Sequence, residues 1–190
     1  MMYDVAIIGA GPAGASAAIF TAKAGKRTIV FDSEQSITRR AWLQNHYGIE
    51  SIDGPELVDI GKRQAQSFGA EMVQAAVNDV KKNTDGFVIA TENETFEAKY
   101  IIFATGLWAD VAEKIGLKTK PATEPRIKTI IDGDGNGRTN IEGIWAAGTV
   151  AGVSVHTIIT AGDGAKVAIN VISEMNGERY VDHDVLKSSN

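Results

Sequence analysis

The sequence of 190 residues contains no cysteine. The chain therefore can form no disulfide, and it offers no thiolate nucleophile and no dithiol pair that could relay electrons. This absence limits the redox functions that the chain can perform by itself.

Basic residues are also fewer than acidic ones. The chain has 19 Lys and Arg residues against 24 Asp and Glu residues, which gives a formal net charge of -5 and a pI near 5.2. Nucleic acids and anionic membranes are bound by clustered positive surfaces. The composition therefore predicts neither of them as a main partner.

Long uninterrupted apolar runs are missing as well. The apolar stretch Val5–Phe20 is broken by glycines and a proline, and it follows Asp4 rather than a basic leader. Such a segment is typical neither of a membrane span nor of a cleavable signal peptide. We therefore expect a cytoplasmic protein.

The first thirty residues have the pattern of a βαβ unit. A β-branched run over Tyr3–Ile8 predicts a strand, and an Ala-rich stretch over Ala13–Ala24 predicts a helix that Gly25 ends as a C-cap. A second apolar run, Arg27–Phe31, predicts the next strand. With 44% hydrophobic and 23% charged residues, the chain is expected to form one compact α/β domain.

The rest of the chain is predicted from turn signals and periodicity. The expected elements are, in order, an irregular loop over 33–53, a helix from Gly54, a small antiparallel meander over 71–104 that returns to a buried strand Tyr100–Ala104, a surface connection to Arg126, a strand over Ile127–Ile131, a strand Ile144–Ala147 and a helix Val155–Met175.

A glycine-rich turn joins the first strand to the first helix. It reads Gly9-Ala10-Gly11-Pro12-Ala13-Gly14. The first glycine permits the tight turn, the second lets a pyrophosphate approach the backbone, and the third packs the helix on the strand. The phosphates would lie at the helix N-terminus. Taken alone, this pattern also fits an ordinary βα turn.

An acidic residue completes the dinucleotide-binding pattern. Asp32 ends the second predicted strand, where a carboxylate can accept hydrogen bonds from both hydroxyls of an adenosine ribose. It would repel the 2′-phosphate of NADP. Glu34 lies close enough in the sequence to take the same role.

Three later segments identify a family. Asp53–Leu57 comes first, after the glycine-rich turn. Ala104-Thr105-Gly106 then ends one predicted strand. Ile144–Gly148 ends another, before a long helix that begins near His156. This order resembles the FAD-binding domain of thioredoxin reductases and their relatives among the pyridine nucleotide-disulfide oxidoreductases, over nearly the whole chain. The resemblance implies a Rossmann-like, three-layer FAD-binding domain with a parallel sheet and a small antiparallel β-meander.

The sequence departs from that family between its two halves. In the family, the chain builds an NADPH-binding domain with a redox-active cysteine pair before it returns to the FAD domain. Here the segment between Gly106 and Gly148 contains no second fingerprint and is too short for a nicotinamide-binding Rossmann unit. We therefore expect a single FAD-binding domain over residues 1–190, similar to thioredoxin reductase but without its NADPH domain and cysteines.

The motif and the resemblance together predict the residues that contact FAD. Asn45 would lie on the flavin side, and Val77 would contact adenine through its backbone. The expected set is Gly9, Gly11, Pro12, Ala13, Gly14, Asp32, Ser33, Glu34, Asn45, Val77, Thr105, Gly106, Gly148, Thr149, His156, Thr157 and Ile158.

Two of these positions differ from the family. Thr149 stands where the family has an aspartate that holds a ribityl hydroxyl, and Val155 and His156 replace an arginine-glutamine pair. The N-terminus of the last helix would still favour negative charge at the flavin's pyrimidine edge. His156 is the one candidate for a catalytic residue, as a proton or hydrogen-bond donor there. The sequence is equally consistent with a His156 that only packs at the start of the helix.

An acidic loop near residue 134 resembles a calcium-binding loop. Asp132, Asp134, Asn136 and Gly137 match the opening of a calcium loop, but Glu142 falls one residue too early and the same residues are typical of a β-turn, so no metal is expected.

Of the three tryptophans, Trp145 is predicted to lie in the core. Trp42 and Trp108 follow cofactor-facing segments and are placed to stack near a flavin, with core packing as the default.

The predicted function is that of an FAD-dependent oxidoreductase. FAD would take electrons from NADH, NADPH or a partner protein and pass them to a separate acceptor without a dithiol relay. A non-catalytic FAD-binding or sensing module that acts through a partner is the alternative, and an NAD-binding Rossmann domain is a third. Because an isolated FAD domain leaves its flavin exposed, a homodimer or a partner protein is expected to cover it.

Overall fold

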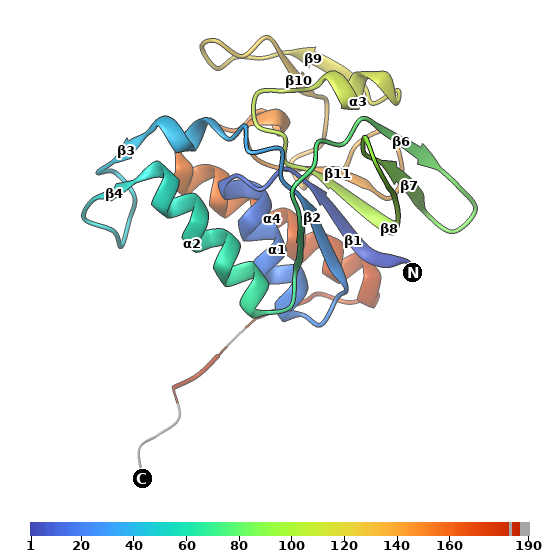
Figure 1. Ribbon diagram of the computed structural model, residues 1–190, viewed down its shortest axis with the longest axis horizontal. Helices are drawn as coiled ribbons and strands as arrows, with labels where there is room; N and C mark the ends of the chain where they lie inside the picture. The colour runs from blue at the N-terminus through green and yellow to red at the C-terminus, as the bar shows by residue number, and fades with distance from the viewer. Residues whose placement is uncertain (183, 187–190) are drawn as a thin grey trace.

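The computed structural model describes residues 1–182 and 184–186. A seven-stranded sheet forms its centre. Three long helices cover one face of the sheet, and an antiparallel meander packs against the other (Figure 1). The molecule is thus built in three layers.

The central part of the sheet is parallel. Its strands are β1 (Tyr3–Ile8), β2 (Thr28–Phe31), β5 (Glu71–Val73), β8 (Thr95–Phe103) and β11 (Ile144–Ala146). They lie in the order β5-β2-β1-β8, with β11 beside β8. Ile8 at the end of β1 is in register with both Phe31 and Phe103. The turns that follow these strands therefore meet at one edge of the sheet.

The helices are α1 (Pro12–Lys23), α2 (Gly54–Ser67) and α4 (Thr157–Asn176). Small residues let α1 and α4 pack closely, because a Cβ atom at Gly164 would lie 2.0 Å from the carbonyl oxygen of Ala13. Gly25 adopts a left-handed φ of +75° just past α1 and donates its N–H to the carbonyl of Ala22. The predicted first helix and its glycine cap are confirmed.

The meander consists of β6 (Asp79–Lys82), β7 (Phe87–Ala90) and the first half of β8. Val80, Phe87 and Ile89 are buried against the face of the sheet that carries Ile8 and Phe31. The buried strand that was predicted over Tyr100–Ala104 is the second half of β8. One nine-residue strand therefore joins the meander to the parallel sheet.

The segments predicted as irregular contain short elements. The loop 33–53 includes the 3₁₀ turn η1 (Ile37–Arg40) and the strand pair β3 (Trp42–Leu43) and β4 (Ile52–Asp53). The connection after Gly106 includes α3 (Asp110–Lys114) and a hairpin of β9 (Thr119–Pro121) and β10 (Thr129–Ile131), at the top of Figure 1. The surface prediction for this connection is corrected in part, because Ala112 and Leu117 are buried in the core.

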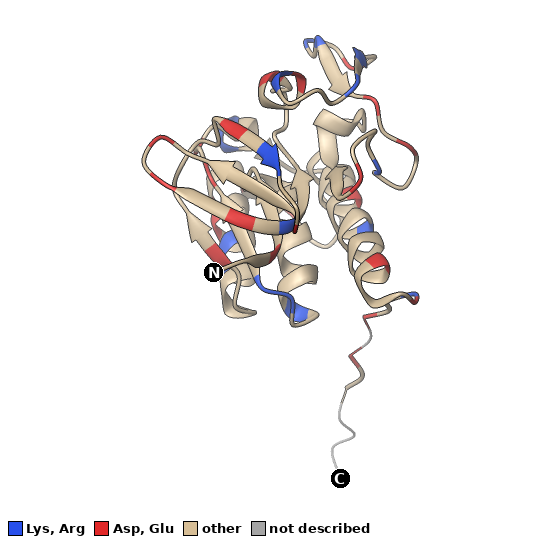
Figure 2. Cartoon of the chain, turned by 90° about the vertical axis from the view of Figure 1, so that its right-hand side faces the viewer, with Lys and Arg blue, Asp and Glu red and all other residues tan. Residues whose placement is uncertain are grey.

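Charged residues of both signs are spread along the chain. Figure 2 shows Lys and Arg interspersed with Asp and Glu on strands, helices and loops. In the described part of the chain, none of the helices has the length and apolar character that a membrane span requires.

Candidate cofactor-binding site

The main cavity lies at the edge where the parallel strands end. It has a volume of about 310 Å³ and is lined by the turns that follow four strands. These turns contribute Gly9–Ala13 after β1, Asp32 and Ser33 after β2, Thr105 and Gly106 after β8, and Ala147 and Thr149 after β11. Ligands of open α/β sheets bind at this carboxyl edge.

The glycines of the first turn have the roles that the fingerprint predicts. Gly9 has a φ of +110°, and a Cβ atom there would lie 2.3 Å from the carbonyl oxygen of Ala104. A Cβ atom at Gly14 would lie 1.8 Å from the carbonyl oxygen of Gly9, so only glycine lets α1 start this close to the strand. The first turn of α1 carries no acidic residue. Its N-terminus therefore presents positive potential to the cavity wall.

Asp32 is buried at the adenosine end of the predicted site, with 7% of its surface exposed. Its Oδ1 accepts the backbone N–H of Glu34 at 2.8 Å, and its Oδ2 accepts a hydrogen bond from Nζ of Lys62 at 2.6 Å. A carboxylate has acceptor capacity for about four hydrogen bonds. Asp32 can therefore still accept bonds from the two hydroxyls of a ribose.

Glu34 lies next to this site but does not line the cavity. It is an exposed residue with a left-handed φ of 60°, and Gln74 donates a hydrogen bond to its carboxylate at 2.7 Å. Of the two candidate acids, the structure thus brings Asp32 to the cavity. Glu34 contributes its backbone N–H.

The turn after β8 leaves room for a ligand. Gly106 has a φ of +67°, and within the described chain no atom lies within 4 Å of the position that a Cβ would take. The hydroxyl of Thr105 donates to the carbonyl of Trp108, which fixes the turn. Trp108 lines the cavity with 54% of its surface exposed. Trp42 lies outside the lining, and Trp145 is 1% exposed, so its predicted core position is confirmed.

A side chain of α4 fixes the turn that follows β11. Asp163, on the second turn of α4, accepts the N–H of Gly148 at 2.8 Å and pairs with Lys166 at 2.5 Å. Thr149 is buried and lines the cavity beside this turn. Val155, just before α4, lines it as well. The N-terminus of the last helix is therefore directed to the same cavity as that of the first.

His156 occupies the N-cap position of α4. It is exposed, and its Nδ1 forms a hydrogen bond of 2.8 Å with Oγ of Ser154. Ser154 also donates to Glu124 at 3.3 Å. His156 lies outside the cavity lining, next to Val155, which belongs to it.

The predicted residues fall into two groups. The cavity is lined by Gly9, Gly11, Pro12, Ala13, Asp32, Ser33, Val77, Thr105, Gly106 and Thr149. Outside the lining lie Gly14, Glu34, Asn45, Gly148, His156, Thr157 and Ile158. Gly14 and Gly148 support turns that do line it. Asn45 is an exposed residue of the loop between β3 and β4, so the structure does not bring it to the other residues.

Several residues of the site were missed from the sequence. Ser36 and Ile37 line the cavity at the start of η1, and Ala75 and Ala76 line it after β5. No local pattern indicates these residues, because their positions depend on how the loops fold. Asp163 did offer a signal, since it is an acid set among the small residues Ala161, Gly162, Gly164 and Ala165 of α4.

The acidic loop after β10 forms a turn. Oδ1 of Asp134 accepts the backbone N–H groups of Asn136 and Arg138 at 2.8 and 2.9 Å. Among the described residues, no group of three or more His, Asp or Glu side chains is gathered as a metal site would require.

Comparison with known proteins identifies the family. The model of the pyridine nucleotide-disulphide oxidoreductase family matches residues 3–110 and again residues 54–165. The thioredoxin reductase of Aquifex aeolicus is 41% identical over 112 residues, which cover 55% of this chain and 34% of that protein. The thioredoxin reductase of Listeria monocytogenes is 35% identical over 108 residues, with the same shares. The chain thus spans about a third of the length of these curated relatives.

The fold agrees with solved structures. A thioredoxin reductase from Gloeobacter violaceus superposes with a TM-score of 0.81 at 16% identity, over 98% of this chain and 99% of that one. The predicted Rossmann-like, three-layer α/β class is therefore confirmed. The family consists of FAD-binding flavoproteins, as the cofactor prediction requires. On this combination of matched sequence and fold, the chain belongs to the pyridine nucleotide-disulphide oxidoreductase family.

Proposed function

We propose that residues 1–190 form one FAD-binding domain that acts as an oxidoreductase without a dithiol relay. The observation that carries this proposal is the convergence of the fingerprint turn, Asp32 and the Thr105-Gly106 and Thr149 turns on one cavity. When bound, FAD supplies the redox chemistry, taking two electrons from a donor and passing them to an acceptor.

Different residues of the cavity bind different parts of the dinucleotide. The N-terminus of α1 receives the pyrophosphate, because backbone N–H groups and the helix dipole favour negative charge there. Asp32 accepts the ribose hydroxyls, and Val77 borders the adenine. The start of α4 lies at the flavin end, where its positive potential stabilises negative charge.

The source of electrons must lie outside this segment of chain. The sequence contains no cysteine, and the connection between Gly106 and Gly148 forms α3 and the β9–β10 hairpin rather than a second nucleotide-binding fold. NADH, NADPH or a reduced partner protein is the proposed donor. His156 is the proposed proton donor at the flavin end, supported by its position at the N-cap of α4.

The flavin end is also the proposed site of assembly. Trp108, Val155, Ile158 and Ile159 are large apolar residues with between 38% and 54% of their surface exposed, and Trp108 and Val155 line the cavity itself. Exposed apolar groups gathered at one place are typical of protein interfaces. A second copy of the chain, or a partner protein, is proposed to cover them.

An absorption spectrum of the purified protein, with FAD added if it is colourless, tests the proposal. Flavin bands that bleach on anaerobic addition of NADH or NADPH are expected, and they name the donor. Bound flavin that resists both donors would support the non-catalytic FAD-sensing alternative or a protein donor. A chain that takes up no FAD would contradict the proposal.

Two glycine variants control for specific binding. Gly9→Ala is expected to abolish FAD uptake, because its Cβ atom would lie 2.3 Å from a backbone oxygen in the cavity wall. Gly25→Ala also places a Cβ atom on a residue with a positive φ, here +75°, but Gly25 has free space, lies past the C-terminal end of α1 and does not line the cavity. It is expected to bind FAD normally. Circular dichroism of both variants verifies that they fold.

A further inference from the structure

We propose that Lys62 is a positioning residue of the FAD site, which holds the carboxylate of Asp32 in the orientation that accepts the adenosine ribose. The inference rests on the proposed FAD-binding function. It begins with a contact that joins two elements 30 residues apart, since Nζ of Lys62 on α2 lies 2.6 Å from Oδ2 of Asp32 after β2.

The stem of Lys62 is fixed by the packing of its helix. Val58 and Ala65, four residues before and three after, are buried on the same face of α2. A Cβ atom at Gly61 would lie 3.2 Å from Cβ of Ala15, so α2 is seated directly on α1. Lys62 therefore reaches Asp32 from a rigid support rather than from a mobile surface.

The carboxylate of Asp32 is held at both oxygens. Glu34 donates its N–H to Oδ1 at 2.8 Å from a left-handed backbone conformation with a φ of 60°. That conformation is uncommon for a residue other than glycine, and such outliers occur where the surrounding structure fixes them. With Lys62 on Oδ2, the carboxylate cannot rotate freely. Its remaining acceptor capacity matches the two hydroxyls of a ribose.

Lys62 acts through Asp32 and not on the dinucleotide directly. Asp32 lines the cavity, while Lys62 lies outside the lining. A buried carboxylate is costly unless it is paired, and Lys62 supplies that pairing. The effect of Lys62 on FAD affinity should therefore exist only while Asp32 is present.

A mutant cycle with measured FAD dissociation constants tests this. Lys62→Gln is expected to weaken FAD binding about tenfold, the loss of a charge-assisted hydrogen bond that orients the acceptor. Lys62→Arg should retain most of the affinity. In the Asp32→Asn background, Lys62→Gln should cause no further loss. Titration with flavin fluorescence gives each constant without any turnover.

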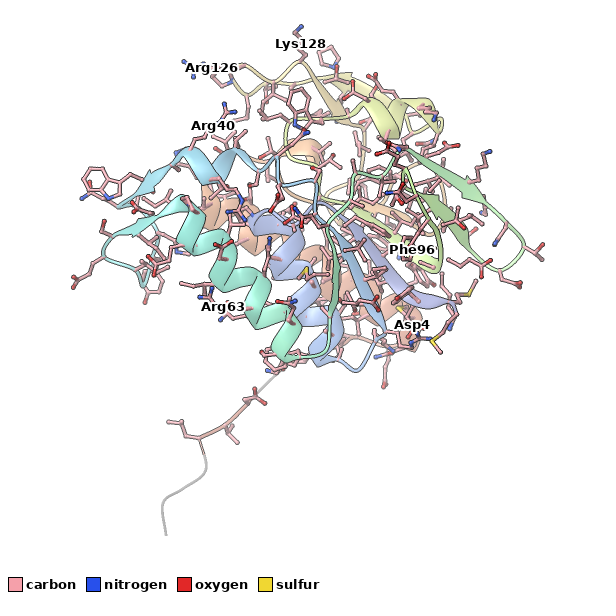
Figure 3. All side chains as sticks on the ribbon, in the orientation of Figure 1. Asp4, Arg40, Arg63, Phe96, Arg126 and Lys128 are labelled. Atoms are coloured by element: carbon pink, nitrogen blue, oxygen red, sulfur yellow. The ribbon has the colours of Figure 1, made fainter. Side chains whose placement is uncertain are left out.

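Arg63 provides a matched control. It is the next residue of α2, is exposed, and projects from the outer side of the helix (Figure 3). Arg63→Gln removes the same charge at nearly the same place and is expected to leave FAD affinity unchanged. If Lys62→Gln fails to fold, Lys62→Met, which keeps the apolar stem and removes only the ammonium group, takes its place.

The outcomes separate the inference from the function on which it rests. Equal FAD affinity of wild type and Lys62→Gln would overturn the inference alone. An equal loss in the wild-type and Asp32→Asn backgrounds would also overturn it, because Lys62 would then attract the dinucleotide by itself. A wild-type chain that binds no FAD would overturn the proposed function, and the inference with it.

Discussion

Asp4 joins the start of β1 to β8 and to Arg27, the residue before β2, on the side of the sheet where β1 begins (Figure 3). From the start of β1, its Oδ2 accepts the N–H of Arg27 at 3.0 Å and its Oδ1 accepts a bond from Lys99 on β8 at 2.9 Å. Burial by itself raises the pKa of Asp4, but these two hydrogen bonds and the positive charges of Lys99 and Lys26 together outweigh it and hold the pKa below its ordinary value. Asp4 therefore stabilises the folded chain in its ionised form.

The contribution of Asp4 to stability should depend on pH. Because its folded pKa is lowered, the contribution is complete above the unfolded value of about 3.8 and is lost as the pH falls through the folded pKa. Asp4→Asn should lower the free energy of unfolding by about 1 kcal/mol at pH 7. Urea unfolding at pH 7 and below pH 4 measures the difference.

The gap between wild type and Asp4→Asn should narrow in acid. Asp85 is exposed in the turn between β6 and β7, so Asp85→Asn should have little effect at either pH and serves as the control. A gap for Asp4→Asn that stays constant from pH 7 to acid would show that the lowered pKa does not contribute to stability.

At the level of single residues, prediction from the sequence succeeded where the chemistry is local. Gly14 meets the carbonyl oxygen of Gly9 within one turn, so the spacing of the fingerprint already encodes this contact. The close approach of Gly9 to Ala104 joins two strands and is not visible in that spacing. Lys62 and Asp163 act on residues 30 and 15 positions away. Their partners become neighbours only when the helices dock on the sheet. No spacing rule could indicate them.

Among the elements, the crossing of α1 and α4 sets the shape of the site. The fingerprint turn precedes α1, and the Gly148 turn precedes α4, so the distance between the two helices fixes the distance between the two turns. Gly164 lies at the crossing, where a Cβ atom would meet the backbone of Ala13 at 2.0 Å. Backbone cannot move aside as a flexible side chain can.

Gly164→Ala is therefore expected to force the helices apart. The free energy of unfolding should fall by roughly 1–3 kcal/mol, the usual cost of overpacking, and FAD affinity should fall with it. Gly162, two residues earlier on the same helix, has free space around it. Gly162→Ala should stabilise the chain by up to about 1 kcal/mol through helix propensity alone. Chemical denaturation and FAD titration of both variants check this, and equal effects at the two positions would contradict it.

The long helices could be predicted from their sequence patterns. The full length of β8, which joins the meander to the parallel sheet, and the short helix α3 could not. α1 has an Ala-rich sequence followed by Gly25, α2 has apolar residues at helical spacing, and α4 is a long, mostly apolar stretch followed by Gly177. β8 was predicted only in its apolar half, because the first half, Thr95–Lys99, alternates like an independent hairpin strand. α3 has only five residues. It is stabilised by burial of Ala112 in the core rather than by its own periodicity.

At the scale of the whole molecule, the uncovered apolar groups at the flavin end predict association. Ile159 on the first turn of α4 is 46% exposed, outside the cavity lining. If a second copy covers this end, the FAD-loaded chain should sediment as a dimer, and Ile159→Lys should shift it to a monomer that still binds FAD. A charge placed in an apolar interface is costly to bury.

A variant of Val181 controls for nonspecific hydrophobic association. Val181 lies just beyond the C-terminal end of α4 and is 57% exposed, so Val181→Lys makes the same chemical change at the opposite end of the helix. The dimer should persist in this variant. A wild-type monomer that carries FAD would contradict dimer formation. A separate protein would then remain as the proposed partner that covers the apolar groups at the flavin end. Dissociation by both variants would place the association elsewhere, because a contact at the flavin end has no reason to depend on Val181.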